Sequence, residues 1–398
     1  MVARAAGSGG EKIVTVVEVA LVDGKWKYTD LNFDLAVVPE PAEDPPEPAG
    51  PPGPPRKIAP FASPRNGLAA VRLRKDAERV YYVDVFGGVI EMVVEREKQV
   101  EYRNLTVELG ASVVGGVSPL AVTEPGGLVV HYVDTNNYLC RLRHQGGWTW
   151  HWYDEAPPVS PAGGLAAMVT TDLSKVFVYY LDERSHLIEV VWPREQRAVV
   201  TDLSSAVGGV PALSPITPLS AVGFDVDSRR IYFLDVNSKP IELAYTADNS
   251  GRRWSCTNMS MTSGAPAAHE GSPLAVGLTK DAKSRVYYHD VAENTVEAHS
   301  SAGGRWAPTV PGRLANDGQG APAAADTSAL AAVLSDDSVR NYVFYQDGAD
   351  HLIVLEWTGG AWVSRDLSAE LRLPSAAHAS PLSAVFDSGP RAYYLSSE

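Results

Sequence analysis

This sequence has little cysteine, a deficit of positive charge and no long apolar run. Cys140 and Cys256 are the two cysteines in 398 residues; they suit buried free thiols better than a disulfide framework, and their spacing fits no zinc site. Acidic residues outnumber basic ones by 48 to 34, and the net charge of −14 argues against nucleic acid as a partner. No apolar segment is long enough for a bilayer, so we expect no membrane insertion.

Familiar catalytic signatures are also missing. The chain has no Gly-x-Ser-x-Gly elbow, no His-Glu-x-x-His, no phosphate-binding loop and no Cys-x-x-Cys. Its 9 histidines form no spaced ligand set, and His131, His151 and His289 are expected to be ordinary strand residues. The sequence therefore predicts neither a metal nor a cofactor.

The first ten residues, Met1 to Gly10, lack the apolar stretch of a signal peptide. Either the chain is not secreted by that route and is cytoplasmic, or a leader has been removed and the protein is extracellular. Two Asn-x-Ser/Thr triplets, which begin at Asn104 and Asn258, predict glycosylation in the second case.

One short phrase returns seven times along the chain. An apolar strand opened by Ser-Pro-Leu, Thr-Pro-Leu, Ser-Ala-Leu or Gly-Leu-Ala precedes a β-branched and aromatic strand that ends in Asp or, once, in Ser. A four-stranded unit repeated at about 50 residues predicts an all-β fold, a seven-bladed β-propeller. The second-strand copies lie at 79–84, 129–134, 177–182, 230–235, 285–290, 342–347 and 391–396.

The seventh repeat stops after two strands, and the missing half stands at the other end of the chain. We expect the N-terminal strands to complete the last blade, because this closes the ring and removes exposed strand edges. The predicted organisation is one propeller domain over 1–398, with closing strands at 12–31, a Pro-rich loop at 36–62 and blades at 63–398. Proline at this density favours an extended, solvated excursion; a lid over one face of the ring is the alternative.

Three side chains recur in register with the repeat. An Arg lies five residues before the strand-ending Asp, a Glu follows the Arg by twelve, and a Trp follows the Glu by eight to twelve. The first blade has Arg79 and Glu91 without a Trp at the expected place. The complete sets are Arg285/Glu297/Trp306, Arg230/Glu242/Trp254 and, across the ring closure, Arg391/Glu18/Trp26.

Sugars present hydroxyls at their edges and a patch of C–H groups on one face. An Arg and a Glu within reach of each other can share a hydroxyl network, while a flat indole packs against the C–H patch. The alternative is structural: the repeated pair is an ion pair between strands, which need not add net stability when buried, and the Trp anchors a turn.

The pattern Arg-Val-Tyr-Tyr-x-Asp, then apolar-Glu, then Gly-Gly-x-Trp, with Ser-Pro-Leu-Ala openings, resembles the fungal fucose-specific lectins over nearly the whole chain. The resemblance implies a propeller that binds fucose between adjacent blades, with Arg and Glu on the hydroxyls and Trp against the ring. Familiar members have six blades, whereas seven repeats are counted here. Several blades also lose the polar set: Val129 and Arg141 replace Arg and Glu, Phe177 replaces Arg, and Tyr342 and Val354 replace both.

These observations leave three functions open. The first is a carbohydrate-binding, lectin-like propeller without catalysis, whose partner is fucose or a related sugar. The second is a fungal secondary-metabolism hetero-Diels–Alderase on the same scaffold, in which the apolar replacements build a pocket for a quinone methide and a terpene olefin. The third is a protein-interaction propeller. Neither the oligomeric state nor any catalytic residue follows from the sequence, and fold analogy alone does not decide function.

Overall fold

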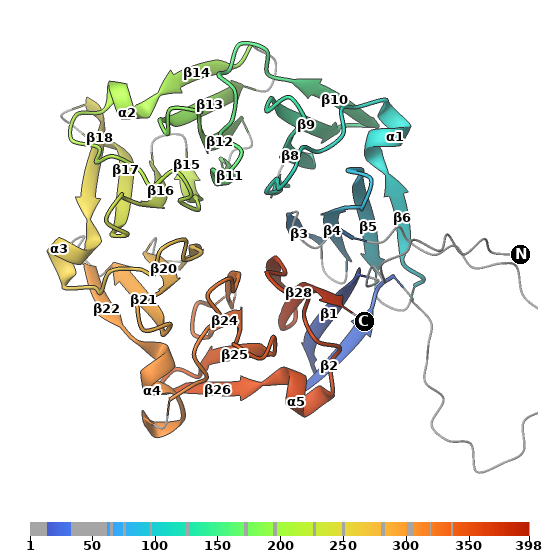
Figure 1. Cartoon of the computed structure of the whole chain (residues 1–398), viewed down its shortest axis with the longest axis vertical. Helices are drawn as coiled ribbons and strands as arrows, with labels where there is room; N and C mark the ends of the chain where they lie inside the picture. The colour runs from blue at the N-terminus through green and yellow to red at the C-terminus, as the bar shows by residue number, and fades with distance from the viewer. Residues whose placement is uncertain are drawn as a thin grey trace, which may run out of the picture.

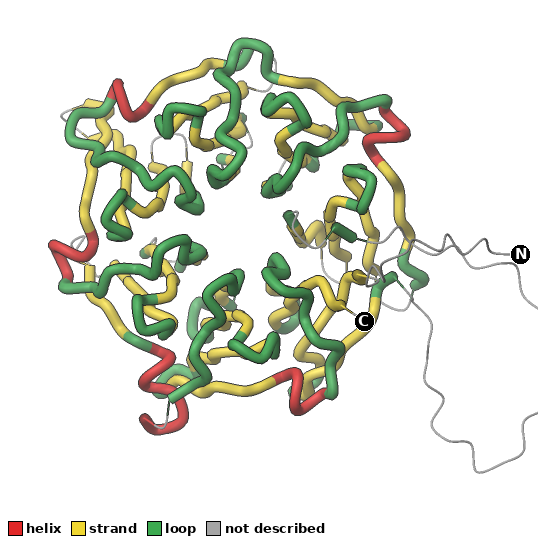
Figure 2. The backbone as a smooth tube through the Cα atoms, viewed as in Figure 1, coloured by secondary structure: helices red, strands yellow, loops and turns green. Residues whose placement is uncertain are grey.

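The computed structural model describes residues 14–32, 62–63, 67–74, 77–95, 98–124, 127–170, 174–193, 197–225, 228–248, 251–279, 283–300, 306–318, 320–335 and 337–397. Seven four-stranded antiparallel sheets are arranged radially around a central axis as the blades of a propeller (Figure 1, Figure 2). The expected all-β, seven-bladed propeller is confirmed.

Within each blade, the chain runs from the innermost to the outermost strand. Blade 1 comprises β3 (Leu68–Arg74), β4 (Ala77–Val83), β5 (Val89–Glu95) and β6 (Glu101–Asn104). Blade 2 comprises β7 (Ala121–Thr123), β8 (Val129–Val133), β9 (Leu139–His144) and β10 (Trp148–Trp152). Blade 3 comprises β11 (Leu165–Val169), β12 (Lys175–Leu181), β13 (Leu187–Pro193) and β14 (Val199–Asp202).

The next three blades repeat this order. Blade 4 comprises β15 (Ser220–Asp225), β16 (Ser228–Leu234), β17 (Pro240–Asp248) and β18 (Gly251–Asn258). Blade 5 comprises β19 (Ala275–Leu278), β20 (Ser284–His289), β21 (Thr295–Ser300) and β22 (Trp306–Thr309). Blade 6 comprises β23 (Leu330–Leu334), β24 (Asn341–Gln346), β25 (Leu352–Trp357) and β26 (Trp362–Asp366).

Blade 7 joins the two ends of the chain, as the incomplete seventh repeat predicts. Its inner strands are β27 (Leu382–Phe386) and β28 (Pro390–Ser397), and its outer strands are β1 (Val14–Val22) and β2 (Lys25–Asp30). The register between β1 and β28 runs from Val14 opposite Ser397 to Ala20 opposite Arg391. The N-terminal strands therefore close the ring. The Pro-rich loop expected at 36–62 lies outside the described residues, apart from Ala62.

Short helices follow the outer strands and explain the two Asn-x-Ser/Thr triplets. Asn104 and Asn258 cap helices α1 (Leu105–Leu109) and α3 (Met259–Ser263), with each side-chain oxygen accepting a backbone N–H at 3.0 Å. Asp202 and Asp366 cap α2 (Leu203–Ala206) and α5 (Leu367–Leu371) in the same way. The triplets thus serve as caps, and glycosylation stays a prediction. Another helix, α4, spans Pro311–Gly318.

The other recurring polar residues also hold the blade together. The strand-ending Asp accepts two backbone N–H groups of the following turn; Asp134, for example, accepts those of Asn136 and Tyr138, both at 2.9 Å. The hydroxyl of the Ser-Pro-Leu opening accepts an N–H of the second strand, as Ser380 does from Leu395 at 2.8 Å. The most regular part of the repeat is therefore structural.

Gly164 opens blade 3 where its backbone passes against blade 4. Its N–H donates to Thr217 O at 3.1 Å, and a Cβ there would stand 2.4 Å from Leu219 N. We expect Gly164→Ala to lower the free energy of unfolding by about 1–3 kcal/mol, since backbone must shift to make room. Urea unfolding measures this against Gly208→Ala, whose added Cβ meets nothing within 4 Å. Equal loss in both variants would contradict this account.

The core lies between the blades, where sheets pack face to face. Twelve of the fully buried large side chains are tyrosines of the second strands. Cys140 is buried and Cys256 half-buried, and both are free thiols. Buried His131 and His289 are strand residues, as expected. No helix among the described residues is long and apolar enough to cross a membrane.

Candidate ligand sites between the blades

The predicted Arg and Glu side chains meet within each of four blades. They stand on the second and third strands, on the same face of the sheet. The Arg–Glu nitrogen–oxygen distances are 2.7 Å for Arg230 and Glu242, 2.5 Å for Arg285 and Glu297, 2.7 Å for Arg391 and Glu18, and 3.3 Å for Arg79 and Glu91.

A tyrosine, which the sequence reasoning did not single out, completes each pair. Tyr232 lies directly opposite Glu242 in the ladder, and its hydroxyl donates to that carboxylate at 3.0 Å. Burial, and then the charge of Glu242, raises the pKa of Tyr232 well above its usual range, so the hydroxyl stays protonated. The signal was present in the sequence, because an aromatic residue follows the Arg position by two in almost every repeat. The equivalents are Tyr81, Tyr287 and Tyr393.

Three of these arginines keep part of the guanidinium accessible. The exposed fractions of the side chains are 21% for Arg79, 23% for Arg230 and 26% for Arg285, whereas their carboxylate partners are nearly buried. Burial opposes the charge of Arg230 and Arg285, but attraction to the paired carboxylate outweighs it and raises the pKa of both. Each pair therefore offers fixed, charged N–H donors beside an oriented carboxylate.

The grouping of each Trp with the Arg and Glu of its own blade is wrong. Trp306 belongs to blade 5, yet its indole N–H donates to Glu242 of blade 4 at 3.4 Å, and its ring meets Tyr232 edge-on at 6.1 Å. Trp254, assigned to Glu242 by spacing, instead packs in the cluster between blades 3 and 4. Each indole thus serves the blade before its own.

The reason is the two-residue period of a strand. In blade 4, Glu242 lies opposite Tyr232, while Tyr245, three residues later, lies opposite Trp254. Residues three apart point to opposite faces of a sheet. Trp254 therefore faces away from Glu242 and toward blade 3, and the same parity holds in the other blades that carry the Trp.

This rearrangement gives the first blade the indole that its own repeat lacks. Trp148 of blade 2 meets Tyr81 of blade 1 edge-on at 6.3 Å, and Trp148, Arg79 and Glu91 line one pocket of about 460 Å³. This volume lies within the range of small-molecule sites. The other lining residues are Leu73, Val93, Glu101, Arg103, Glu124, Gly127, Leu128 and His144.

Two further junctions bring the same side-chain types together. Between blades 4 and 5 these are Arg230, Glu242 and Trp306, and between blades 5 and 6 Trp362 shares a core cluster with Tyr287, the partner of Glu297. Both indoles are almost buried, Trp306 at 5% and Trp362 at 4% exposed. The half-buried Trp148 therefore belongs to the most accessible of the three sets.

The third predicted set, Arg391/Glu18/Trp26, is split by the structure. Trp26 meets Phe344 of blade 6 edge-on at 6.0 Å, in an apolar cluster with Tyr342 and Val354. Arg391 turns instead to blade 1, where it pairs with Glu78 at 3.2 Å as well as with Glu18. Only 10% of the Arg391 side chain is exposed, so the contacts of Arg391 with the two carboxyl groups close this junction.

The junction between blades 3 and 4 is filled by an arginine of the protein itself. Arg229 pairs with both carboxylate oxygens of Glu189, at 3.1 and 3.3 Å, and 7% of its side chain is exposed. Its guanidinium carbon lies 4.5 Å from the ring of Phe177 and 4.9 Å from that of Trp254. Neither the carboxylate nor the indole face is left for a ligand here.

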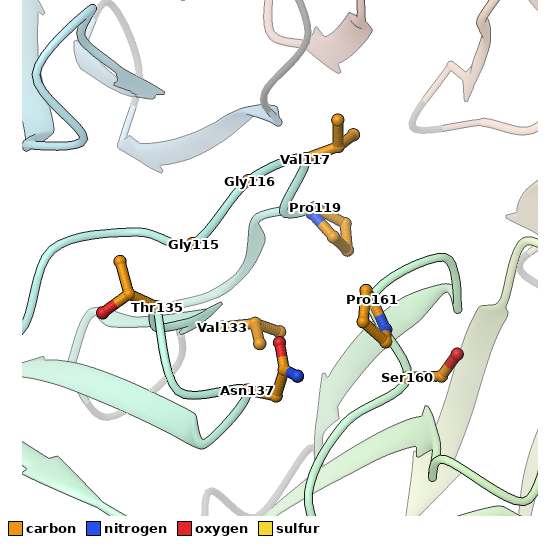
Figure 3. A pocket seen from close by; sticks show the side chains of 9 residues that line it. All are labelled: Gly115, Gly116, Val117, Pro119, Val133, Thr135, Asn137, Ser160 and Pro161. Atoms are coloured by element: carbon orange, nitrogen blue, oxygen red, sulfur yellow. The ribbon is translucent and has the colours of Figure 1, made fainter.

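The apolar replacements lie in the packing between blades. Val129, Phe177, Tyr342 and Val354 are each at most 3% exposed. A separate hollow of about 140 Å³ lies between loops of blades 2 and 3, lined by Gly115, Gly116, Val117, Pro119, Val133, Thr135, Asn137, Ser160 and Pro161 (Figure 3). Its volume is below the usual range for an organic ligand. Among the described residues, no group of His, Cys, Asp and Glu is placed to hold a metal.

Comparison with solved structures finds a similar fold in several proteins, lectins among them. A mutant of the Aleuria aurantia lectin, in complex with α-methyl-L-fucoside, is 21% identical, covering 75% of this chain and 94% of its own, with a TM-score of 0.53. A mutant of AofleA from Arthrobotrys oligospora is 18% identical; the match covers 76% of this chain and 87% of AofleA, with a TM-score of 0.54. The BP39L lectin from Burkholderia pseudomallei is 15% identical; the match covers 78% of this chain and 87% of the lectin, with a TM-score of 0.55.

No family model matches the sequence, and no curated protein matches it. The Aleuria aurantia lectin is described as a six-bladed propeller, whereas this ring has seven blades. The likeness at these identities is one of fold, a lectin-like β-propeller.

Proposed function

We propose that this propeller is a carbohydrate-binding protein that takes a fucoside at the junction between blades 1 and 2. The observation that carries the proposal is the pocket lined together by Arg79, Glu91 and Trp148. The guanidinium and carboxylate suit a pair of ring hydroxyls, and the accessible indole suits the C–H face of the sugar. The fold shared with a lectin bound to α-methyl-L-fucoside supports the choice of sugar.

The junctions between blades 4 and 5 and between blades 5 and 6 are proposed as weaker copies. They keep the charged pairs of Arg230 and Arg285, but each indole is largely covered. The closed junctions at Arg229 and Arg391 are not expected to bind. Several modest sites on one ring would act together on a surface that carries many sugars.

Titration calorimetry with methyl α-L-fucoside tests this proposal. We expect Arg79→Ala and Glu91→Gln each to weaken the strongest site at least tenfold, because a charge-assisted hydrogen bond contributes about 1.5–3 kcal/mol. Trp148→Ala should weaken it as well, while Trp152→Ala on the same strand, with a side chain 46% exposed, is the matched control. An isotherm unchanged by Arg79→Ala would contradict the proposal.

The same titration separates the cross-blade sets from the sets within one blade. Arg230→Ala should remove one weak site. Arg365→Ala should remove none, because Arg365 lies on the outer strand β26 and pairs with Glu370. Trp254→Ala should leave the site at Glu242 intact. If no variant or wild-type protein binds fucoside up to tens of millimolar, the hetero-Diels–Alderase alternative, with an apolar substrate, becomes the next to test.

A further inference from the structure

The junction between blades 2 and 3 contains an arginine and an indole, but at other positions than in the remaining junctions. Arg141 stands where five other blades carry Glu, and Val129 stands where four of them carry Arg. In blade 3 the fourth strand carries no indole, and the third strand supplies one instead, Trp192, directly after the Val191 that pairs with Val199. This junction therefore has an arginine and an indole, and a positive side chain occupies the position of the usual carboxylate.

Arg141 is fixed by aromatic side chains. Its guanidinium carbon lies 3.4 Å from the ring centroid of Trp192 and 5.3 Å from that of Tyr153, and its Nη1 lies 3.5 Å from the Tyr153 hydroxyl. The guanidinium of Arg143 lies 4.5 Å from the same Trp192 ring. Stacking of this kind holds the planar face of a guanidinium and leaves its N–H edge for an acceptor.

Arg141 differs from the other junction arginines in its partner. Arg229, Arg230 and Arg285 each meet a carboxylate within 3.1 Å, whereas no ion pair of Arg141 with a carboxylate is found among the described residues. Of the acidic side chains that follow β10, Glu155 is paired with Arg197. A half-buried guanidinium that stacks on an indole, and that has no ion pair among the described residues, can offer its N–H edge to an anion.

A buried histidine lies next to Tyr153 in the same junction. His131 is fully buried, its Nε2 lies 3.5 Å from the Tyr153 hydroxyl, and its Nδ1 has no hydrogen-bond partner in the described structure. Burial, and then the charge of Arg141, lowers the pKa of His131 to about 3, so the ring is neutral at pH 7. The positive charge of the junction therefore comes from the arginines.

We propose that this junction binds a sugar that carries a carboxylate, such as a uronic acid, with Arg141 on the carboxylate. The carboxylate of the ligand would stand in for the Glu that five other blades supply. That the ligand is a sugar rests on the proposed function, since the junction is the positional equivalent of the fucoside site. A guanidinium fork matches a carboxylate in two parallel hydrogen bonds, which a neutral sugar cannot offer.

Calorimetry with methyl β-D-glucuronoside and methyl β-D-glucoside on the full chain tests this inference. We expect saturable, millimolar binding of the glucuronoside and at least tenfold weaker binding of the glucoside. Arg141→Gln should abolish the difference, and Arg141→Lys, which keeps the charge but loses the fork, should weaken glucuronoside binding severalfold. Arg184→Gln, at an exposed arginine of the neighbouring hairpin, is the control, and thermal melting verifies that each variant is folded.

The two proposals fail separately. If Arg141→Gln loses the glucuronoside but binds methyl α-L-fucoside like the wild type, both stand; if Arg79→Ala loses only the fucoside, the sites are independent. Equal affinity for glucuronoside and glucoside, or glucuronoside binding unchanged in folded Arg141→Gln, would overturn this inference whatever the fucoside result. Glucuronoside binding that depends on Arg141 in a protein that binds no fucoside would overturn the proposed fucoside site alone.

Discussion

Deletion of residues 1–30 is expected to abolish the folded monomer. β1 and β2 supply the third and fourth strands of blade 7, and seven of the nine residues of β1 are buried. Without them, β28 has an unpaired edge and two apolar clusters lose their cover. Each Val or Leu side chain taken out of the core costs about 1.5–3 kcal/mol, so a few of them equal the whole stability of a typical domain.

Size-exclusion chromatography and thermal unfolding measure this result. The truncated chain should elute as aggregates without a cooperative transition, because exposed strand edges pair with other chains. A truncation of residues 1–13, which keeps β1 and β2, is the matched control, and a peptide of residues 12–32 added to the longer truncation should restore soluble monomer. A monomeric truncation of 1–30 that melts like the full chain would contradict the account of ring closure.

Much of the fold can be predicted from the sequence because its repeat consists of groups that build the blade. The strand-ending Asp shapes a turn, and the Ser of Ser-Pro-Leu ties the first strand to the second. Such residues must recur wherever the local structure recurs. The incomplete seventh repeat and the strands at the N-terminus then require closure of the ring, since an unpaired edge is unfavourable.

The candidate sites were harder to predict, because they lie between repeats. Spacing along the chain places Trp254 nearest to Glu242, yet the indole beside that carboxylate is Trp306, one blade further on. A count of strand parity finds the error: Tyr245, opposite Trp254, is three residues from Glu242 and so faces the other side of the sheet. The same count shows that Trp26 faces away from Glu18. Trp26 lies opposite Leu21, and Leu21 is three residues from Glu18.

Other details depend on contacts that have no linear signal. Phe177, unlike the arginine at this position in other blades, cannot pair with Glu189. Arg229 of the next blade pairs with Glu189 instead and lies over the Phe177 ring. Asn104 begins an Asn-x-Thr triplet, and in the structure its side chain also caps a helix and donates to Asp84 at 3.2 Å. Short sequence patterns do not distinguish these roles, because the same residue types serve both.

Glu78 is expected to make the stability of the ring depend on pH near neutrality. It lies in β4, 1% exposed, facing Arg391, Tyr393 and Glu18 of the closing blade, with Asp387 also nearby. Burial raises its pKa from an ordinary 4.5 to about 7, although the charge of Arg391 acts in the opposite direction. The folded protein therefore holds a proton on Glu78 that the unfolded chain releases near pH 4.5.

The sign follows from proton binding. A folded-state pKa above the unfolded one stabilises the fold fully below pH 4.5, and this stabilisation is lost as pH rises through 7. The difference corresponds to at most about 3 kcal/mol. Urea unfolding from pH 4.5 to 8 should show the wild type losing stability relative to Glu78→Gln, whose neutral amide cannot ionise. Glu101→Gln, at an exposed residue of β6, is the control and should follow the wild type. If the stability of the wild type and of Glu78→Gln changed with pH in the same way, Glu78 would not hold this proton in the folded protein.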